Sequence, residues 1–189
     1  MEYSLKHVAT DIDRLLAKGA NNRKSAMHTP VVVTNDADAR IMVLRHYDRA
    51  ERTLRFHTDV RSPKVEIIRA SSSVGVLFYD AEEKTQLRCR GVGEIQTDTA
   101  LARAAWDGSD TYARRCYLGA APGEARNHPS SGLPEWAEGK RPSEADLAPV
   151  RGNFAVLLVR LEEIDWYHLA SDGHRRALFE HGEGRWLTP

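Results

Sequence analysis

Apolar side chains recur at helical spacing near the start of the chain, at Leu5, Val8, Ile12, Leu15 and Leu16. This spacing gathers them on one face of a helix, and Gly19 follows where a C-terminal cap would stand. The pattern therefore predicts an amphipathic helix within residues 1–20.

The pattern then changes to one typical of strands, at residues 30–34, 40–47 and 53–58. The stretches between them are short and polar, and they have the composition of turns. Because such gaps are too short for crossover helices, we expect these three strands to form an antiparallel meander.

A short helix is expected to begin at Ser62-Pro63, since serine is a good N-cap and proline suits the first helical position. Strands are expected at residues 73–79 and 85–96, and Gly91 and Gly93 predict a bulge or bend in the longer one. Helical segments are expected from residue 98 or 99 to about 106 and over residues 112–118.

Residues 119–150 contain five prolines with several glycines and serines, and they predict a long loop, either a lid or a surface decoration. A strand over residues 153–166 follows. Asp172-Gly173 indicates a hairpin, and residues 175–180 and 185–187 complete the strands. Six to eight antiparallel strands with few helices predict a single mainly β domain, a barrel or a sandwich, over residues 1–189.

Composition narrows the function classes. Lysine plus arginine and aspartate plus glutamate each number 27, so no global charge directs the chain to nucleic acid or anionic lipid. No apolar run is long enough to span a membrane, and residues 1–4 lack the features of a signal peptide. Cys89 and Cys116 do not have metal-ligand spacing, and a disulfide between them stays open. We expect a cytoplasmic protein without a metal site.

The most informative cluster combines cations and hydroxyl groups around the start of one predicted helix, namely Arg40, Thr58, Arg61, Ser62 and Lys64. Arginine offers a planar fork for phosphate oxygens, and free N–H groups at a helix start favour anions. Asp59 is the one acidic residue expected to oppose them. The cluster predicts a phosphate site beside an apolar strand that could face a flat ring; the alternative is a solvated turn with a capped helix.

Three further positions have a polar or aromatic group that could meet a heterocycle. Gln86 can both donate to and accept from a ring edge, or it simply occupies an exposed strand face. Trp166 and Arg176 lie across the predicted hairpin and could close over an aromatic ligand, although a tryptophan there is more often part of the core. No Ser/His/Asp set, metal-ligand cluster or glycine-rich dinucleotide motif is present.

These residues resemble the pyridoxamine 5′-phosphate oxidase family in order and spacing from about residue 30 to residue 189. The resemblance implies an antiparallel split β-barrel with flanking helices that binds FMN at the interface of a homodimer. It assigns the FMN phosphate to Arg40 and to the segment of Arg61, Ser62 and Lys64, and further cofactor contacts to Ile41, Met42, Val43, Leu44, Arg45, His57, Thr58 and Gln86. It also implies that the partner chain supplies the tryptophan and arginine that match Trp166 and Arg176.

The chain departs from the vitamin B6 oxidases of this family between the tryptophan and the arginine. Those enzymes grip substrate phosphate there with an Arg-x-His motif, whereas this chain has Asp172 and His174. A carboxylate at that place would repel a phosphorylated substrate. His174 and Arg114 remain the candidate substrate contacts, with no catalytic acid or base identified.

Three functions follow from the resemblance. The first is an FMN-dependent oxidoreductase with a different, unphosphorylated substrate, in which the cofactor accepts or donates a hydride. The second is a true pyridoxamine or pyridoxine 5′-phosphate oxidase whose clamp is rebuilt from His174, Arg175 and Arg114. The third is a non-catalytic flavin or haem binding protein, for which a deazaflavin is an alternative to FMN.

Overall fold

The computed structural model describes residues 4–189, and its centre is one antiparallel sheet in the strand order β2-β1-β5-β6-β7-β4-β3, with β8 and β9 added beside β7. The strands are β1 (Val31–Thr34), β2 (Ala39–Ile41), β3 (Leu44–Asp48), β4 (Thr53–Asp59), β5 (Ser73–Asp80), β6 (Thr85–Gln96), β7 (Phe154–His168), β8 (Arg175–Glu180) and β9 (Glu183–Leu187). The predicted mainly β, antiparallel fold is confirmed.

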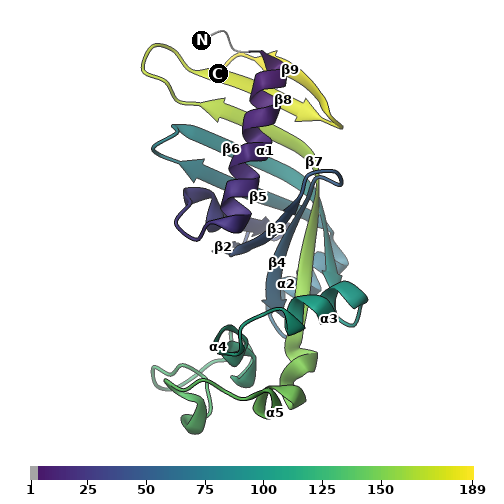
Figure 1. Cartoon of the computed structure of the whole chain (residues 1–189), viewed down its shortest axis with the longest axis vertical. Helices are drawn as coiled ribbons and strands as arrows, with labels where there is room; N and C mark the ends of the chain where they lie inside the picture. Colours follow the sequence, from purple (N-terminus) through teal and green to yellow (C-terminus); the bar gives the residue numbers. More distant parts are fainter. Residues whose placement is uncertain (1–3) are drawn as a thin grey trace.

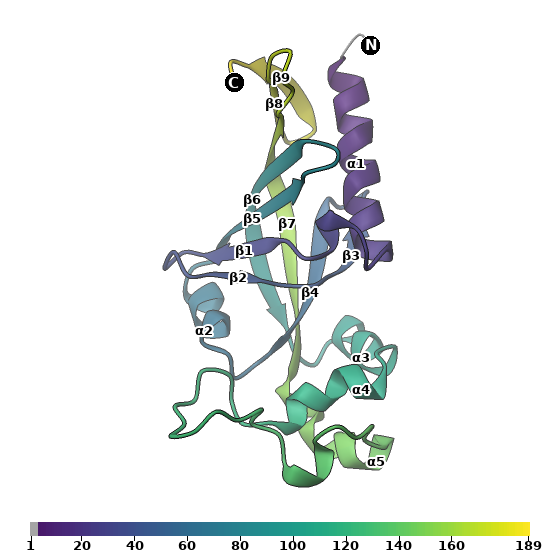
Figure 2. The same ribbon diagram turned by 90° about the vertical axis from the view of Figure 1, so that its left-hand side faces the viewer.

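The predicted strand over residues 40–47 is wrong as a single element. The chain leaves β2 after Ile41, crosses at Met42 and Val43, and pairs again only as β3. β2 and β3 therefore lie at opposite ends of the strand order although two residues join them, and the sheet curls round to bring these ends together (Figure 2). The antiparallel pairings of the predicted meander are present, β1 with β2 and β3 with β4, but the break at Met42 and Val43 makes them two separate hairpins instead of one continuous meander.

Strands β6 and β7 form the spine of the sheet, paired along almost their whole length. Their register shifts between Arg90 and Gly91, which confirms the predicted bulge. The shift brings the backbone of β7 so close to Gly91 that a Cβ there would lie 2.1 Å from the carbonyl oxygen of Arg160. Glycine is therefore required at this point of the spine.

Helix α1 (Leu5–Asn21) lies across one face of the sheet (Figure 1). Ser4 caps its N-terminus by accepting a hydrogen bond from the backbone N–H of His7, and the apolar face predicted from the sequence is buried. This face joins the main core, where Phe56, Phe78 and Trp166 are also buried. Helix α2 (Pro63–Ala70) packs against β1 and β6.

A second hydrophobic cluster lies below the barrel, among the short helices at the other end of the molecule (Figures 1 and 2). These helices are α3 (Ala100–Asp107), α4 (Thr111–Arg114), η2 (Arg115–Leu118), α5 (Glu144–Leu147) and η4 (Ala148–Asn153). Trp106, Tyr117 and Phe154 pack with their ring centroids 5.3–5.7 Å apart. The predicted long loop is thus shorter than expected, because its last residues, 144–150, fold into α5 and η4. The short helix η3 (Glu135–Ala137) interrupts the rest.

No helix among residues 4–189 has the length and apolar character needed to cross a bilayer. Cys89 and Cys116 are both free thiols, so the disulfide left open by the sequence is not formed. The single-domain organisation and the cytoplasmic location remain predictions.

Candidate functional site

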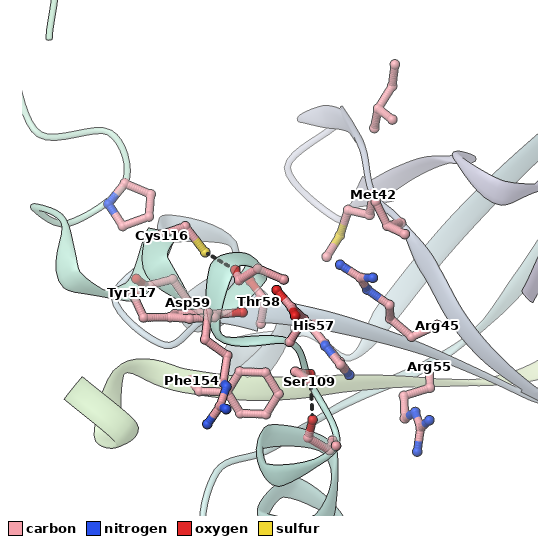
Figure 3. A pocket seen from close by; sticks show the side chains of 18 of the residues that line it. Met42, Arg45, Arg55, His57, Thr58, Asp59, Ser109, Cys116, Tyr117 and Phe154 are labelled. Carbon is pink, nitrogen blue, oxygen red and sulfur yellow. Dashed lines mark hydrogen bonds between the residues drawn. The ribbon is translucent and has the colours of Figure 1, made fainter. Parts of the chain in front are cut away.

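A cavity of about 650 Å³ opens where the crossing between β2 and β3 and the end of β4 face helices α3 and α4 (Figure 3). One wall is made by Arg40 to Val43 and by side chains of β4, and the other by the helical segment from Ala104 to Tyr117. Six of its lining side chains are cationic, namely Arg23, Arg40, Arg45, Arg55, Lys64 and Arg114, whereas only Asp59 and Asp110 are acidic. The cavity is therefore suited to anions.

Lys64 lies at one end of the cavity, held by two hydroxyl groups. Its ammonium group donates to Ser62 Oγ at 2.6 Å and to Thr58 Oγ1 at 3.3 Å, and it forms no ion pair within residues 4–189. Burial lowers the pKa of Lys64, and the nearby charge of Arg40 lowers it further. The charges of Asp59 and Asp38 raise this pKa only in part, so an anion in direct contact with Lys64 would offset both effects further.

Arg40 reaches the same end of the cavity but already has protein partners. Its guanidinium donates to the carbonyl oxygen of Val32 at 3.3 Å and to Thr34 Oγ1 at 3.0 Å, and it pairs with Asp38. The sequence-based view that only Asp59 opposes the cations is therefore wrong, because Asp38 also does. These contacts fix the position of the guanidinium beside Lys64.

Arg61 and Ser62 do not line the cavity. Arg61 makes a bidentate ion pair with Asp59, at 2.6 and 2.9 Å, and it also donates to the carbonyl oxygen of Gly119 at 3.1 Å. Ser62 is the N-cap residue of α2 as predicted, but its hydroxyl accepts from Lys64 instead of capping the helix. The cationic cluster thus reduces to Arg40 and Lys64, supported by two hydroxyl groups.

The apolar crossing between β2 and β3 borders the cavity as the sequence predicted. Ile41, Met42, Val43 and Arg45 line it, whereas Leu44 is fully buried in the main core. A contact between Leu44 and a ligand is therefore not supported.

His57 lies on β4 and lines the cavity, and its ring packs edge-on against Phe154 with the ring centroids 4.9 Å apart (Figure 3). Burial lowers the pKa of His57 to about 4, and the charges of Arg45 and Arg55 contribute to this shift. The imidazole is therefore neutral near pH 7. Its Nε2 atom is buried without a hydrogen-bond partner among the described residues.

Gln86, Trp166 and Arg176 lie away from the cavity. Trp166 is only 2% exposed, packed in the main core and stacked on His168 at 5.8 Å between centroids. Arg176 pairs across the hairpin with Tyr167, the neighbour of Trp166, so the two predicted partners lie on opposite faces of the sheet. Arg176 forms a bidentate ion pair with Asp165, at 2.8 and 3.1 Å.

The candidate substrate contacts are not brought together within the chain. Arg114 lines the cavity, but it is buried, lies over the ring of Trp106 and donates to Glu144 at 3.0 Å. His174 lies in the turn before β8 and packs against Tyr167. A phosphate clamp built from His174, Arg175 and Arg114 is therefore not assembled in one chain.

Sequence reasoning missed Arg23, Arg55 and the helical wall of the cavity. Arg55 alternates with His57 along β4, so period-2 spacing could have placed both side chains on one face. The helical wall could not be found in this way, because it depends on how α3 packs against β7 and how α4 packs against α5.

Comparison with known proteins agrees with this fold. Residues 10–97 match the family model described as "Pyridoxamine 5'-phosphate oxidase, FMN-binding domain". No curated protein matches the chain.

Among solved structures, a pyridoxamine 5′-phosphate oxidase-related, FMN binding protein from Nostoc punctiforme PCC 73102 is similar over 100% of both chains, with 20% identity and a TM-score of 0.75. PhzG from Burkholderia lata 383, solved in complex with tetrahydrophenazine-1-carboxylic acid, is similar over 95% of this chain and 91% of its own, with 17% identity and a TM-score of 0.68. A Clostridium acetobutylicum protein related to general stress protein 26 has 12% identity, 97% and 95% coverage and a TM-score of 0.53.

Identities this low show a shared fold, and the family model adds a match in sequence over the segment that carries Arg40, His57 and Lys64. Residues 10–97 accordingly match the pyridoxamine 5′-phosphate oxidase-like FMN-binding family in sequence, and the chain as a whole has the fold of distant relatives of that family.

Proposed function

We propose that this protein binds FMN in the cavity, with the phosphate group at Lys64 and Arg40, and acts as an FMN-dependent oxidoreductase on a small molecule. The observation that carries the proposal is the ammonium group of Lys64, which is half-buried, has only hydroxyl oxygens as acceptors and lies beside a second cation. A buried charge without an ion-pair partner is costly, so a phosphate group at this position would stabilise the folded protein.

The residues at this end suit a phosphate group. Arg40 presents a guanidinium already oriented by Val32, Thr34 and Asp38, which lowers the entropy lost when it binds. Lys64 adds a second charge, and Thr58 adds a hydroxyl that can donate to a phosphate oxygen. Bound FMN would supply hydride-transfer chemistry that none of these side chains can perform.

The remaining residues of the cavity would orient the flavin ring and enclose it. Met42 and Val43 form an apolar surface on which a flat ring can lie, and Phe154 closes the other side. His57 stays neutral near pH 7, so it can donate or accept one hydrogen bond without adding charge.

We further propose a homodimer. Ile41, Leu77 and Tyr79 are 70%, 38% and 52% exposed, and register pairs place Ile41, Val31 and Leu77 side by side on one face of the sheet. Gln86 lies opposite Tyr79 on that face. A second copy covering this face would bury the apolar side chains and bring Gln86 towards the edge of the cavity, where Ile41 already lies.

Titration of cofactor-free protein with FMN and with riboflavin, followed by quenching of flavin fluorescence, tests the proposal. We expect saturable binding of one FMN per chain and much weaker binding of riboflavin, which lacks the phosphate. A protein that takes up neither flavin would exclude the proposed function.

A further inference from the structure

A second cavity, of about 180 Å³, lies where α1, the turn between β3 and β4 and the turn between β8 and β9 meet. The two turns lie beside each other at one edge of the sheet, at the right of the view in Figure 1. Arg52, in the first turn, reaches the second, since its Nη1 atom lies 4.0 Å from the position that a Cβ would take on Gly182. The two cavities share no lining residue, so they are separate sites.

Buried apolar side chains form the floor of this second cavity. Ile12 comes from the core face of α1, Ile164 from β7 and Phe179 from β8. The ring of Tyr47, on β3, adds an aromatic wall. An apolar cavity of about 150 Å³ is large enough for a benzene ring. The second cavity can therefore hold one six-membered ring with a small substituent, and it is too small for a flavin.

Asp13 is the one acidic side chain among the described residues that line this cavity, and its charge is already compensated. The hydroxyl of Tyr47 donates to one of its carboxylate oxygens at 2.7 Å, and Arg49 pairs with the other at 2.6 Å. Burial raises the pKa of Tyr47, and the hydrogen bond to Asp13 raises it further, so this hydroxyl keeps its proton. Asp13 is therefore not available to compensate another cation.

Arg52 is the cation at the rim that has no such partner. It is half-buried, and its side chain makes no hydrogen bond or ion pair within residues 4–189. Burial raises the pKa values of Tyr47 and Cys89, and the charge of Arg52 opposes both shifts. This charge thus acts on buried groups of β3 and β6, where a low dielectric constant strengthens electrostatic interactions. The rim consequently has one uncompensated positive charge above an apolar floor.

We propose that this cavity binds a small aromatic monocarboxylate, with its ring on Ile12, Ile164 and Phe179 and its carboxylate on the guanidinium of Arg52. The planar fork of a guanidinium group matches the two oxygens of a carboxylate, and one free cation matches one negative charge. The site goes beyond the proposed flavin chemistry and does not depend on it. A ligand here would contact α1 and the β8–β9 hairpin together.

Calorimetric titration of the full-length protein with benzoate and with benzamide, its neutral isostere, tests the site. We expect one benzoate to bind per chain, tenfold or more tightly than benzamide. Because the flavin cavity also has cations, the titration is repeated with saturating FMN, which should change benzoate affinity less than twofold.

Two variants with matched controls place the ligand. Arg52→Gln should weaken benzoate binding at least tenfold, to the level of benzamide. Lys84→Gln is its control, since Lys84 is an exposed cation of another turn with nearly the same backbone angle, φ +49° against +48°. Ala9→Phe should abolish binding of both probes by filling the cavity, whereas Ala17→Phe, on the exposed face of α1, should not.

Arg52→Gly is a second variant if Arg52→Gln folds poorly, because glycine adopts this positive φ without strain. Benzoate that binds no more tightly than benzamide would overturn the proposal. Benzoate affinity unchanged in the Arg52 variants or in Ala9→Phe, or competition between benzoate and FMN, would also overturn it. A protein that takes up no FMN contradicts only the proposed function, since the benzoate titrations need no cofactor.

Discussion

At the residue scale, the site depends on how much charge the protein leaves uncompensated. Arg61 has the right charge, but it pairs with Asp59 and does not line the cavity, and Arg114 is buried and pairs with Glu144. Arg40 also has a partner, the exposed Asp38, but it lines the cavity beside Lys64. Lys64 has only hydroxyl partners, and Arg55 has none among the described residues. The sequence identified Arg40, Thr58 and Lys64 because they lie close together along the chain. It could not identify Asp38 as the partner of Arg40, because the conformation of the turn between β1 and β2 decides whether these two side chains meet.

His57 gives a pH-dependent prediction at the same scale. Its pKa is about 4 in the folded protein and near 6.5 when unfolded. Between these values the unfolded chain binds a proton that the folded chain does not, so stability should fall as pH decreases from 6.5 to 4. At about 1.4 kcal/mol for each pKa unit, the loss should be about 1–3 kcal/mol after allowance for partial exposure.

Urea unfolding of cofactor-free protein at pH 7 and pH 4.5 measures this loss. We expect His57→Gln to remove much of the difference between the two pH values, and His128→Gln, in an exposed loop, to retain it. Equal pH dependence in His57→Gln and the wild-type protein would show that His57 is not held neutral by its surroundings.

At the element scale, the strands and helices with clear periodicity or capping signals were predicted well. α1, β4 and β6 begin and end within a few residues of the expected positions. The segment from Ile41 to Leu44 was not, because four consecutive apolar residues give no alternation that could reveal the break between β2 and β3. Trp166 and Arg176 were paired wrongly for a related reason, since a shift of one residue in a hairpin moves a side chain to the other face.

The bulge in β6 gives the prediction for this scale. Gly91→Ala should destabilise the protein by at least about 2 kcal/mol, because the new Cβ would lie 2.1 Å from the carbonyl oxygen of Arg160 and the spine would have to shift. Gly75→Ala, in the neighbouring strand, is the control, since its nearest atom would be 3.7 Å away. Urea unfolding compares the two variants, and equal midpoints would contradict the role assigned to Gly91.

At the scale of the whole molecule, one chain assembles the cavity but leaves Gln86 and Arg176 elsewhere. The sequence could not determine this arrangement. Tertiary packing decides which face of the sheet each strand residue occupies and where α3 and α4 lie. The exposed apolar face that carries Leu77 and Tyr79 also carries Gln86, which offers a physical reason why a second chain would complete the site.

Sedimentation velocity tests the proposed homodimer. The wild-type protein should sediment with twice the chain mass of 21.2 kDa, and Leu77→Glu should shift it to the monomer because a carboxylate would be buried in the interface. Leu101→Glu, at a leucine of nearly equal exposure on α3, should leave the dimer intact. A wild-type monomer that still holds FMN tightly would contradict the dimer.

The central claim is that Lys64 and Arg40 bind the phosphate group of FMN. The most direct measurement compares the affinities for FMN and riboflavin in the wild-type protein, in Lys64→Met and Arg40→Ala, and in Lys6→Met as a control on exposed α1. Each site variant should lose about 2 kcal/mol of FMN affinity, since a charge-assisted contact is removed, with little change for riboflavin. If the wild-type protein binds both flavins equally, or if both site variants keep the full preference for FMN, the account is contradicted.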